Sequence, residues 1–347
     1  MTSPMIPIST AQTFTPFLEF LYEHGSPVNR WLDQCQLPHF LFDRPNSYIP
    51  TLNIYRFVDL AERREGIDEF GLHVSKDRIL QAMGPRLVHS IYSAPTLLCA
   101  IREYGIKSRA EYSAMRVWTS EHDDNTVRIN LKKSFPPHVP GFRQTEWFGV
   151  MAFIKLIEGF AGRGWQPDTI SLISKQLLPP LAMGLFPDVH FRTNQQECYI
   201  SFPKTLLSLR PSRYGTEVVS NLSAKSADVS PKTPPMGFAE TVTEILKTYL
   251  RDGYLPIERA SEIADTSKRS FQRRLAEDGL SYSKLVARAR FEVAADLLAT
   301  TDASSLEIAF ETGYDDASHF ARAFRRIAGC SPREYRRRTR RGLAGNG

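Results

Sequence analysis

The C-terminal part of the chain aligns with itself when it is shifted by 49 positions. Four of the aligned positions are apolar and one is an arginine, and each copy has helical spacing. The aligned pairs are Ile257 with Leu306, Ala260 with Ala309, Phe271 with Phe320, Arg273 with Arg322, and Leu275 with Phe324. Each copy predicts two short helices joined by a tight turn, so the sequence contains a helix-turn-helix pattern twice.

The rest of the chain divides at a region that is rich in serine and proline. A length of 347 residues favours two domains, and 42% apolar residues are enough for ordinary cores. Residues 211–237 have few large apolar side chains, which predicts a linker. We therefore expect an N-terminal domain over residues 1–210 and a C-terminal domain over residues 238–347.

Helices and strands are both predicted before the linker, so the N-terminal domain is expected to be α+β. Apolar periodicity predicts helices over residues 12–23, 26–37, 51–64 and 146–160. Alternating residues on either side of 121–125 predict a β-hairpin within 112–133. Further strands are predicted near 169–173, 189–192 and 198–202.

After Phe238 the pattern predicts helices alone, so the C-terminal domain is expected to be all-α. Besides the recognition helices, helices are predicted over about 238–252, 256–264, 282–299 and 332–338. The first recognition helix is capped by Ser267, and the second begins at Asp316 or Ser318. In the second copy, Ser304 and Glu307 predict a capping box for a support helix that contains Leu306, Ile308, Ala309 and Phe310, and Gly313 predicts the turn. The helix over 282–299 would be about 27 Å long. A spacer of this size can hold two recognition helices roughly 34 Å apart, which is one turn of DNA.

The outward faces of the two recognition helices are suited to DNA. Lys268, Arg269, Gln272 and Arg273 face outward in the first copy, where arginine suits guanine and glutamine suits adenine. In the second copy the outward residues are Ser318, His319 and Arg322, followed by Arg325 and Arg326. We predict phosphate contacts for Lys268, Arg325 and Arg326. The alternatives are a solvated basic helix face and, for His319, a surface histidine without a role.

The charge distribution also favours a polyanionic partner. The net charge is +6, and residues 322–341 hold nine arginines against a single acid, Glu334. The alternative for residues 336–341 is a solvated, disordered tail.

Residues 270–338 contain Gly313-Tyr314, the Phe320 and Phe324 pair, Arg325-Arg326, and the ending Gly329, Ser331-Pro332 and Tyr335. In these residues the C-terminal domain resembles the AraC/XylS family of bacterial transcription regulators. Tyr314 departs from the pattern, in which phenylalanine is more usual. The resemblance implies that Arg269, Gln272, Arg273, Ser318, His319 and Arg322 contact bases.

The N-terminal domain is similar to the sensor domain called arabinose-binding-like. The similarity lies in Gly164-Trp165-Gln166-Pro167, the Val189 and Phe191 strand, and Ile200 and Phe202 leading to Leu206. It implies effector sensing without specifying the effector. The four tryptophans could line an effector pocket or belong to the core, and Arg102, Arg109 and Arg116 could receive an anion or lie on the surface.

Several classes of protein lack support in the sequence. Cys35, Cys99, Cys198 and Cys330 form no Cys-x-x-Cys pair, so neither a disulfide framework nor a metal site is predicted. The N-terminus lacks a signal-peptide pattern, and no apolar run approaches about 18 residues. We expect a cytoplasmic protein without membrane contact or cofactor. No metalloprotease, phosphate-loop or nucleophile-elbow motif is present, so we expect no enzyme activity.

We therefore predict a sequence-specific DNA-binding transcription regulator that acts as an activator. Its expected partners are double-stranded promoter DNA, RNA polymerase, a small-molecule effector of unspecified identity and a second copy of the chain. One rival is an enzyme or repair protein with a DNA-binding tail, which would need a reactive Cys35, Cys99 or Cys198. The other rival is a sequence-tolerant architectural DNA binder.

Overall fold

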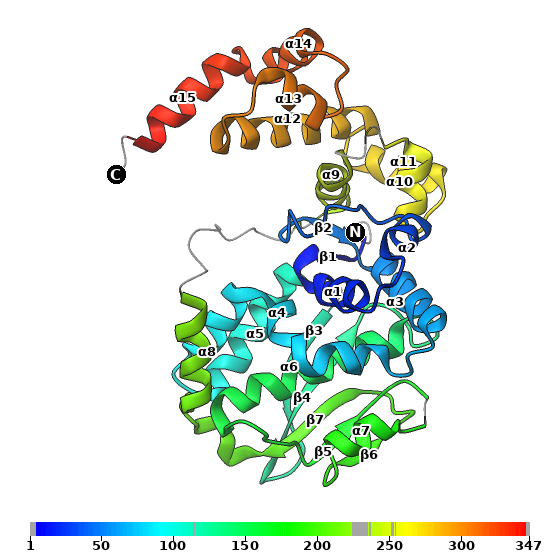
Figure 1. The fold of residues 1–347 in the computed structure, drawn as a ribbon, viewed down its shortest axis with the longest axis vertical. Coiled ribbons are helices and arrows are strands. Elements are labelled where there is room, and N and C mark those ends of the chain that lie inside the picture. The colour runs from blue at the N-terminus through cyan, green and yellow to red at the C-terminus, as the bar shows by residue number, and fades with distance from the viewer. Residues whose placement is uncertain are drawn as a thin grey trace. The chain divides into compact units, whose positions relative to one another are not determined.

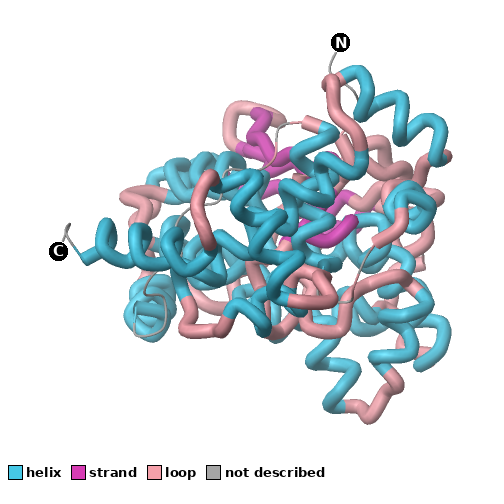
Figure 2. Tube along the Cα trace, turned by 90° about the horizontal axis from the view of Figure 1, so that it is seen from above, coloured by secondary structure: helices cyan, strands magenta, loops and turns pink. Residues whose placement is uncertain are grey.

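A computed structural model describes residues 5–113, 115–175, 177–223, 235, 237–250, 253 and 255–344 (Figure 1). The chain forms two compact units, of which the first is Pro7–Pro234 and the second is mainly residues 235–347. The first unit contains helices and strands, and the described part of the second contains helices alone. Figure 2 marks the strands in magenta among the helices. The predicted fold class, α+β followed by all-α, is confirmed.

The first unit is built around a buried helix. Helix α6 has Trp147, Phe153 and Ile157 among its buried residues, and it packs against α4 and β7. Helix α4 is kinked, because Gly84 has φ 75° and ψ 152° and Pro85 follows it. The helices are α1 (Thr15–Glu23), α2 (Val28–Gln34), α3 (Thr51–Glu65), α4 (Phe70–Tyr92), α5 (Leu97–Glu111), α6 (Phe142–Ala161), α7 (Pro180–Leu185), α8 (Arg213–Ser223), with 3-10 turns η1 (Ala11–Thr13) and η2 (Lys204–Ser208).

Two sheets complete this unit. Strands β1 (Ile8–Thr10) and β2 (Tyr48–Pro50) pair antiparallel. The larger sheet has the order β3-β4-β7-β5-β6. Its strands are β3 (Met115–Glu121), β4 (Thr126–Lys133), β5 (Thr169–Ser171), β6 (His190–Arg192) and β7 (Cys198–Pro203). The register aligns Ile129, Ile200 and Ile170 across three neighbouring strands, and all three are fully buried. The predicted hairpin is β3–β4, whereas helices α4 and α5 are absent from the sequence prediction.

The predicted linker begins too early in the chain. Helix α8 occupies residues 213–223 and packs against α4 and α6. The backbone N–H of Ser212 donates a 2.9 Å hydrogen bond to the carbonyl of Gly159, and Gly215 lies against the same peptide. Val218, Val219 and Leu222 add an apolar face that packs on the core. The remaining predicted linker residues, apart from 235 and 237, lie outside the described residues.

The helices of the second unit follow the predicted order. They are α9 (Phe238–Tyr249), α10 (Ile257–Ile263), α11 (Lys268–Glu277), α12 (Tyr282–Thr300), α13 (Ser305–Glu311), α14 (Ala317–Ala328) and α15 (Pro332–Ala344). Helix α12 packs against α9, which precedes it in the chain, and against α13 and α15, which follow it. Across the described residues of both units, no helix is both long and apolar enough to span a bilayer.

Candidate nucleic-acid interface

The first copy of the repeat is a helix-turn-helix formed by α10 and α11. Phe271 and Leu275 are buried on one side of α11, and the Phe271 ring packs edge-on against Phe238 at 5.3 Å and Tyr282 at 6.0 Å. The Ser267 hydroxyl accepts a 3.2 Å hydrogen bond from the Ser270 backbone N–H. This cap satisfies one of the unpaired donors at the helix start. One face of α11 is therefore fixed in the core.

The opposite face of α11 is exposed and basic. Lys268, Arg269, Gln272 and Arg273 are all exposed, as predicted from the helical period. Lys268 Nζ lies 2.5 Å from Glu258 Oε1 on α10, and this hydrogen bond lowers the pKa of the Glu258 carboxyl. Arg273 Nε lies 3.7 Å from Glu277 Oε1 one turn along the helix. Both ion pairs are exposed to solvent, so phosphate can compete with the carboxylates.

The second copy is formed by α13 and α14, and its local signals are the predicted ones. Ser304 and Glu307 exchange two hydrogen bonds of 2.6 and 3.2 Å in a complete capping box. Gly313 has φ 74° in the turn. Asp316, not Ser318, caps α14, because its Oδ1 accepts a 2.7 Å hydrogen bond from the His319 backbone N–H. That hydrogen bond lowers the pKa of the Asp316 carboxyl.

The outward face of α14 is also open. Phe320 and Phe324 are buried at 1% and 2%, whereas Ser318, His319, Arg322, Arg325 and Arg326 are all exposed. The His319 ring packs edge-on against Tyr314 at 5.5 Å. His319 therefore touches the turn residue that precedes the helix, which limits the directions its ring can take.

Helix α12 contacts both motifs. Its 19 residues span about 28 Å. Near its start, the Tyr282 hydroxyl donates a 2.5 Å hydrogen bond to the carbonyl of Leu255, which precedes α10. Further along, Arg290 Nη2 donates a 2.9 Å hydrogen bond to the carbonyl of Gly313, and its guanidinium lies 4.7 Å from the Tyr314 ring centroid. One helix thus contacts the segments that position both motifs.

An ion-pair network joins α12 to α9. Glu292 lies 2.5 Å from Lys247 Nζ and 2.7 Å from Arg288 Nε. Burial alone would raise the pKa of Glu292, but the hydrogen bonds from Lys247 and Arg288 lower it. The charged form of Glu292 is therefore favoured, which holds α9 against the middle of the spacer.

Comparison with known proteins agrees with this arrangement. A helix-turn-helix domain family matches residues 260–338, and the arabinose-binding domain of AraC transcription regulators, N-terminal, matches residues 25–210. The chain belongs to the AraC family of transcription regulators.

Relatives of this AraC-family chain align over nearly its full length. The ornithine utilization regulator of Pseudomonas aeruginosa is 24% identical over 96% of this chain and 97% of its own. The regulator VirS of Mycobacterium tuberculosis is 22% identical over 92% of this chain and 94% of its own. Among solved structures, the regulator CdpR of Pseudomonas aeruginosa has 19% identity and a TM-score of 0.38, covering 90% and 96% of the two chains.

In the helix predicted to support the second motif of the AraC-type domain, Leu306 and Phe310 are 49% and 58% exposed. Only one stripe of the two-turn helix α13 faces inward, and Ile308 and Ala309 occupy it. The alternative that residues 336–341 form a disordered tail is wrong, because α15 includes them. Arg336 donates to the carbonyls of Leu298 and Ala303, and Arg340 Nη1 lies 2.7 Å from Asp302 Oδ1.

Some residues that matter to the AraC-type domain give little signal in the sequence. Arg290 lies on the predicted spacer, but its contact with Gly313 joins the spacer to the turn of the second motif. Arg336 stands in an arginine run that also suits a solvated tail. Neither helical period nor local motif distinguishes these two arginines from their exposed neighbours.

Proposed function

We propose that this AraC-family regulator controls transcription by placing α11 and α14 in two successive major grooves of promoter DNA. The observation that carries the proposal is a shared geometry. Each recognition helix buries one aromatic face and exposes the opposite basic face, and a single helix of about 28 Å supports both. That length is close to the roughly 34 Å between successive major grooves on one face of DNA.

Base contacts are assigned to the exposed residues that begin each recognition helix. They are Arg269, Gln272 and Arg273 on α11, and Ser318, His319 and Arg322 on α14. Lys268, Arg325 and Arg326 are assigned to phosphates, because a flexible or peripheral cation neutralises the backbone without reading a base. Phosphate neutralisation supplies much of the affinity and makes it depend steeply on salt.

Hydroxyl-radical footprinting of the full chain on a selected promoter fragment tests this arrangement. We expect two protected patches about 10 base pairs apart on one face of the duplex. Protection in one groove only, or on opposite faces, contradicts the proposal. Uniform protection of any duplex would instead support a sequence-tolerant architectural protein.

The first unit is proposed to sense an effector and to pair with a second copy, and the regulator is proposed to activate RNA polymerase in the cytoplasm. The family assignment supports a sensor at this position. In vitro transcription with purified polymerase tests the sign of regulation, and light scattering tests the dimer. A repressed promoter would contradict activation, and a monomeric mass at micromolar concentration would contradict pairing.

We propose no enzyme activity. The enzyme rival relies on a reactive thiolate, but Cys35 and Cys198 are buried. Burial raises the pKa of the Cys35 thiol to about 11 and that of Cys198 well above its usual value. A thiol that keeps its proton at neutral pH is a poor nucleophile. Cys99, the third candidate, is half-buried, so rapid thiol titration of the folded chain at Cys35, Cys99 or Cys198 would revive the rival.

A further inference from the structure

The first unit contains a cavity of about 70 Å³. It lies among the N-terminal segment, helices α3, α5 and α6, and strand β4, and its wall is mainly apolar, with Phe17, Ile54, Phe148 and Ala152 contributing. One water-sized sphere fills roughly 10–15 Å³ of a cavity, so about five such groups fit. The space therefore suits a small organic molecule.

One lysine interrupts this apolar wall. Lys133, the last residue of β4, is the sole formally charged residue among those that line the cavity in the described chain. Its Nζ lies 5.5 Å from the ring centroids of Tyr55 and Phe142. Lys133 is half-buried, and among the described residues its ammonium has no hydrogen-bonding or ion-pairing partner. Burial lowers the pKa of Lys133 to about 7.

The acidic group whose charge acts on Lys133 accepts hydrogen bonds from other residues. Glu146 raises the pKa of Lys133 by its charge, as does Cys198, but neither offsets the effect of burial. Glu146 Oε1 accepts a 2.7 Å hydrogen bond from the Ile173 backbone N–H, and Oε2 accepts from Ser174. The carboxylate is thus committed to the loop after β5. Glu146 therefore makes no direct ion pair with Lys133, and an ammonium without a direct hydrogen-bonding partner beside an apolar cavity is costly.

Phenol groups supply further donors. Tyr55, Tyr104 and Tyr112 line the same cavity from α3, α5 and the segment after α5. Burial raises the pKa of all three hydroxyls, so they stay protonated near neutral pH. A protonated phenol can donate a hydrogen bond. An ammonium and phenol donors together match the oxygens of a carboxylate, and the apolar wall matches a short hydrocarbon body.

We propose that this cavity binds a small monocarboxylate, with the carboxylate at Lys133 and the hydrocarbon body against Phe17, Ile54 and Phe148. This inference rests on the sensing role proposed above for the first unit. The site differs from the surface arginines Arg102, Arg109 and Arg116, which are exposed and do not line the cavity. The four tryptophans do not line it either.

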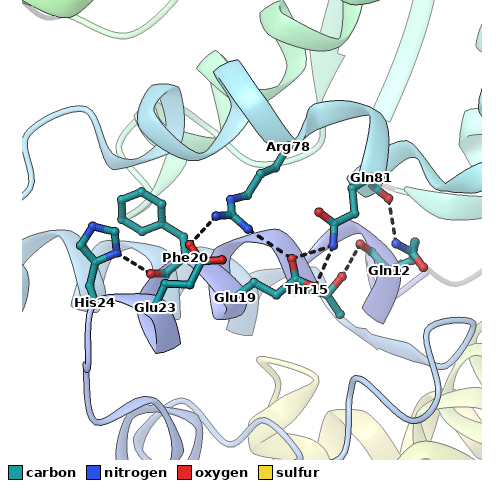
Figure 3. Close-up of polar contacts among 8 residues, drawn as sticks. All are labelled: Gln12, Thr15, Glu19, Phe20, Glu23, His24, Arg78 and Gln81. Atoms are coloured by element: carbon teal, nitrogen blue, oxygen red, sulfur yellow. Dashed lines mark hydrogen bonds and ion pairs between the residues drawn. The ribbon is translucent and has the colours of Figure 1, made fainter. Parts of the chain in front are cut away.

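The cavity wall includes the N-terminal segment from β1 to α1, which is hydrogen-bonded to α4. Ser9, Thr13 and Phe17 line the cavity from β1, η1 and α1. Figure 3 shows how the outer side of this segment is held: Arg78 Nη2 lies 2.5 Å from Glu23, and Gln81 Nε2 donates a 2.7 Å hydrogen bond to Glu19. Gln12 Nε2 donates a 2.7 Å hydrogen bond back to the Gln81 carbonyl. A ligand in the cavity would thus contact a wall with a defined position.

Isothermal titration calorimetry on the full chain tests the ligand class. The probes are the straight-chain carboxylates from acetate to hexanoate, and for the tightest of these its amide and its amine. We expect saturable binding of at least one carboxylate, with the amide and amine weaker by about tenfold or more. No heat from any carboxylate, or equal binding of the amide, overturns the proposal.

Two matched variants locate the charge. Lys133→Met removes the ammonium but keeps an unbranched side chain of nearly the same length, and we expect it to weaken carboxylate binding by about tenfold or more. Lys132→Met is the control, because Lys132 is the exposed neighbour on the same strand and does not line the cavity. It should bind within about twofold of wild type. Thermal melting confirms that both variants fold, and unchanged binding by Lys133→Met overturns the assignment.

The pH dependence provides a second readout. Binding requires the protonated amine and the ionised carboxylate, so affinity should be constant between about pH 6 and pH 7 and fall as the pH rises above 7. Of the groups facing Lys133, the three tyrosines and Cys198 have raised pKa values, and Glu146 is held by its hydrogen bonds. Proton uptake measured in two buffers should appear above pH 7. A carboxylate affinity that stays constant from pH 6 to 9 contradicts a role for Lys133.

Promoter binding is measured on the same preparation. If wild type binds its DNA site but no carboxylate, the ligand assignment fails and the DNA assignment stands. If it binds a carboxylate but protects no DNA, the ligand site stands and the DNA-reading geometry fails.

Discussion

Arg290 holds the second turn against the spacer, since its Nη2 donates a 2.9 Å hydrogen bond to the Gly313 carbonyl oxygen. We predict that Arg290→Met, which loses this bond and the contact with the Tyr314 ring, lowers the free energy of unfolding by about 1–3 kcal/mol. Urea denaturation of the full chain, followed by far-ultraviolet circular dichroism, measures the change. Lys284→Met on the exposed side of α12 is the control, and equal loss in both variants would deny Arg290 a specific role.

Arg273 and Arg322 occupy equivalent positions in the two copies, and both are exposed. We predict that Arg273→Ala and Arg322→Ala each weaken promoter binding by about 1–3 kcal/mol and relax base preference at one position. Fluorescence anisotropy with single-base variants of the site measures both effects. Arg64→Ala is a control for net charge, because Arg64 is an exposed arginine of the first unit. Unchanged affinity in both recognition-helix variants would defeat the groove assignment.

Arg325 lies on α14 one turn beyond the proposed base-reading residues and is exposed. We predict that Arg325→Ala weakens binding by a similar factor on cognate and mismatched sites. The slope of log affinity against log salt should also become shallower by about one, because one phosphate contact is lost. Anisotropy titrations over a range of potassium chloride concentrations provide the slope. A loss confined to the cognate site would assign Arg325 to a base instead.

Gly215 approaches the Gly159 peptide so closely that an added Cβ would lie 2.3 Å from its carbonyl oxygen. We predict that Gly215→Ala lowers the free energy of unfolding of the first unit by about 1–3 kcal/mol, because α8 must move away from the Gly159 peptide on α6. Urea denaturation monitored by tryptophan fluorescence is suitable, since all four tryptophans precede residue 166. Gly184→Ala serves as the control, because no atom lies within 4 Å of its added Cβ. Equal stability of the two variants would contradict the docking of α8.

Local interactions allowed much of the second unit to be predicted. The spacer was expected over 282–299 and spans Tyr282–Thr300, and Ser267 and Ser304 cap the helices where their spacing indicated. Caps and helical periods depend on residues within about one turn of each other, so the sequence contains them directly. The exposure of Leu306 and Phe310 was not predictable in this way. Periodicity shows which residues share a face of α13, but not how much of that face the neighbouring helices cover.

The sequence alone determined that the first unit contains helices and a hairpin and is α+β. It also determined that the second unit contains a helix-turn-helix motif twice. Tertiary structure alone decided the strand order, the seat of α8 on Gly159, and the convergence of Ser9, Tyr55 and Lys133 on one cavity. These residues come from β1, α3 and β4, which are far apart in sequence. These residues come together only when whole helices and strands pack against one another. The sequence pattern of one element does not show which side chain of another element it will contact.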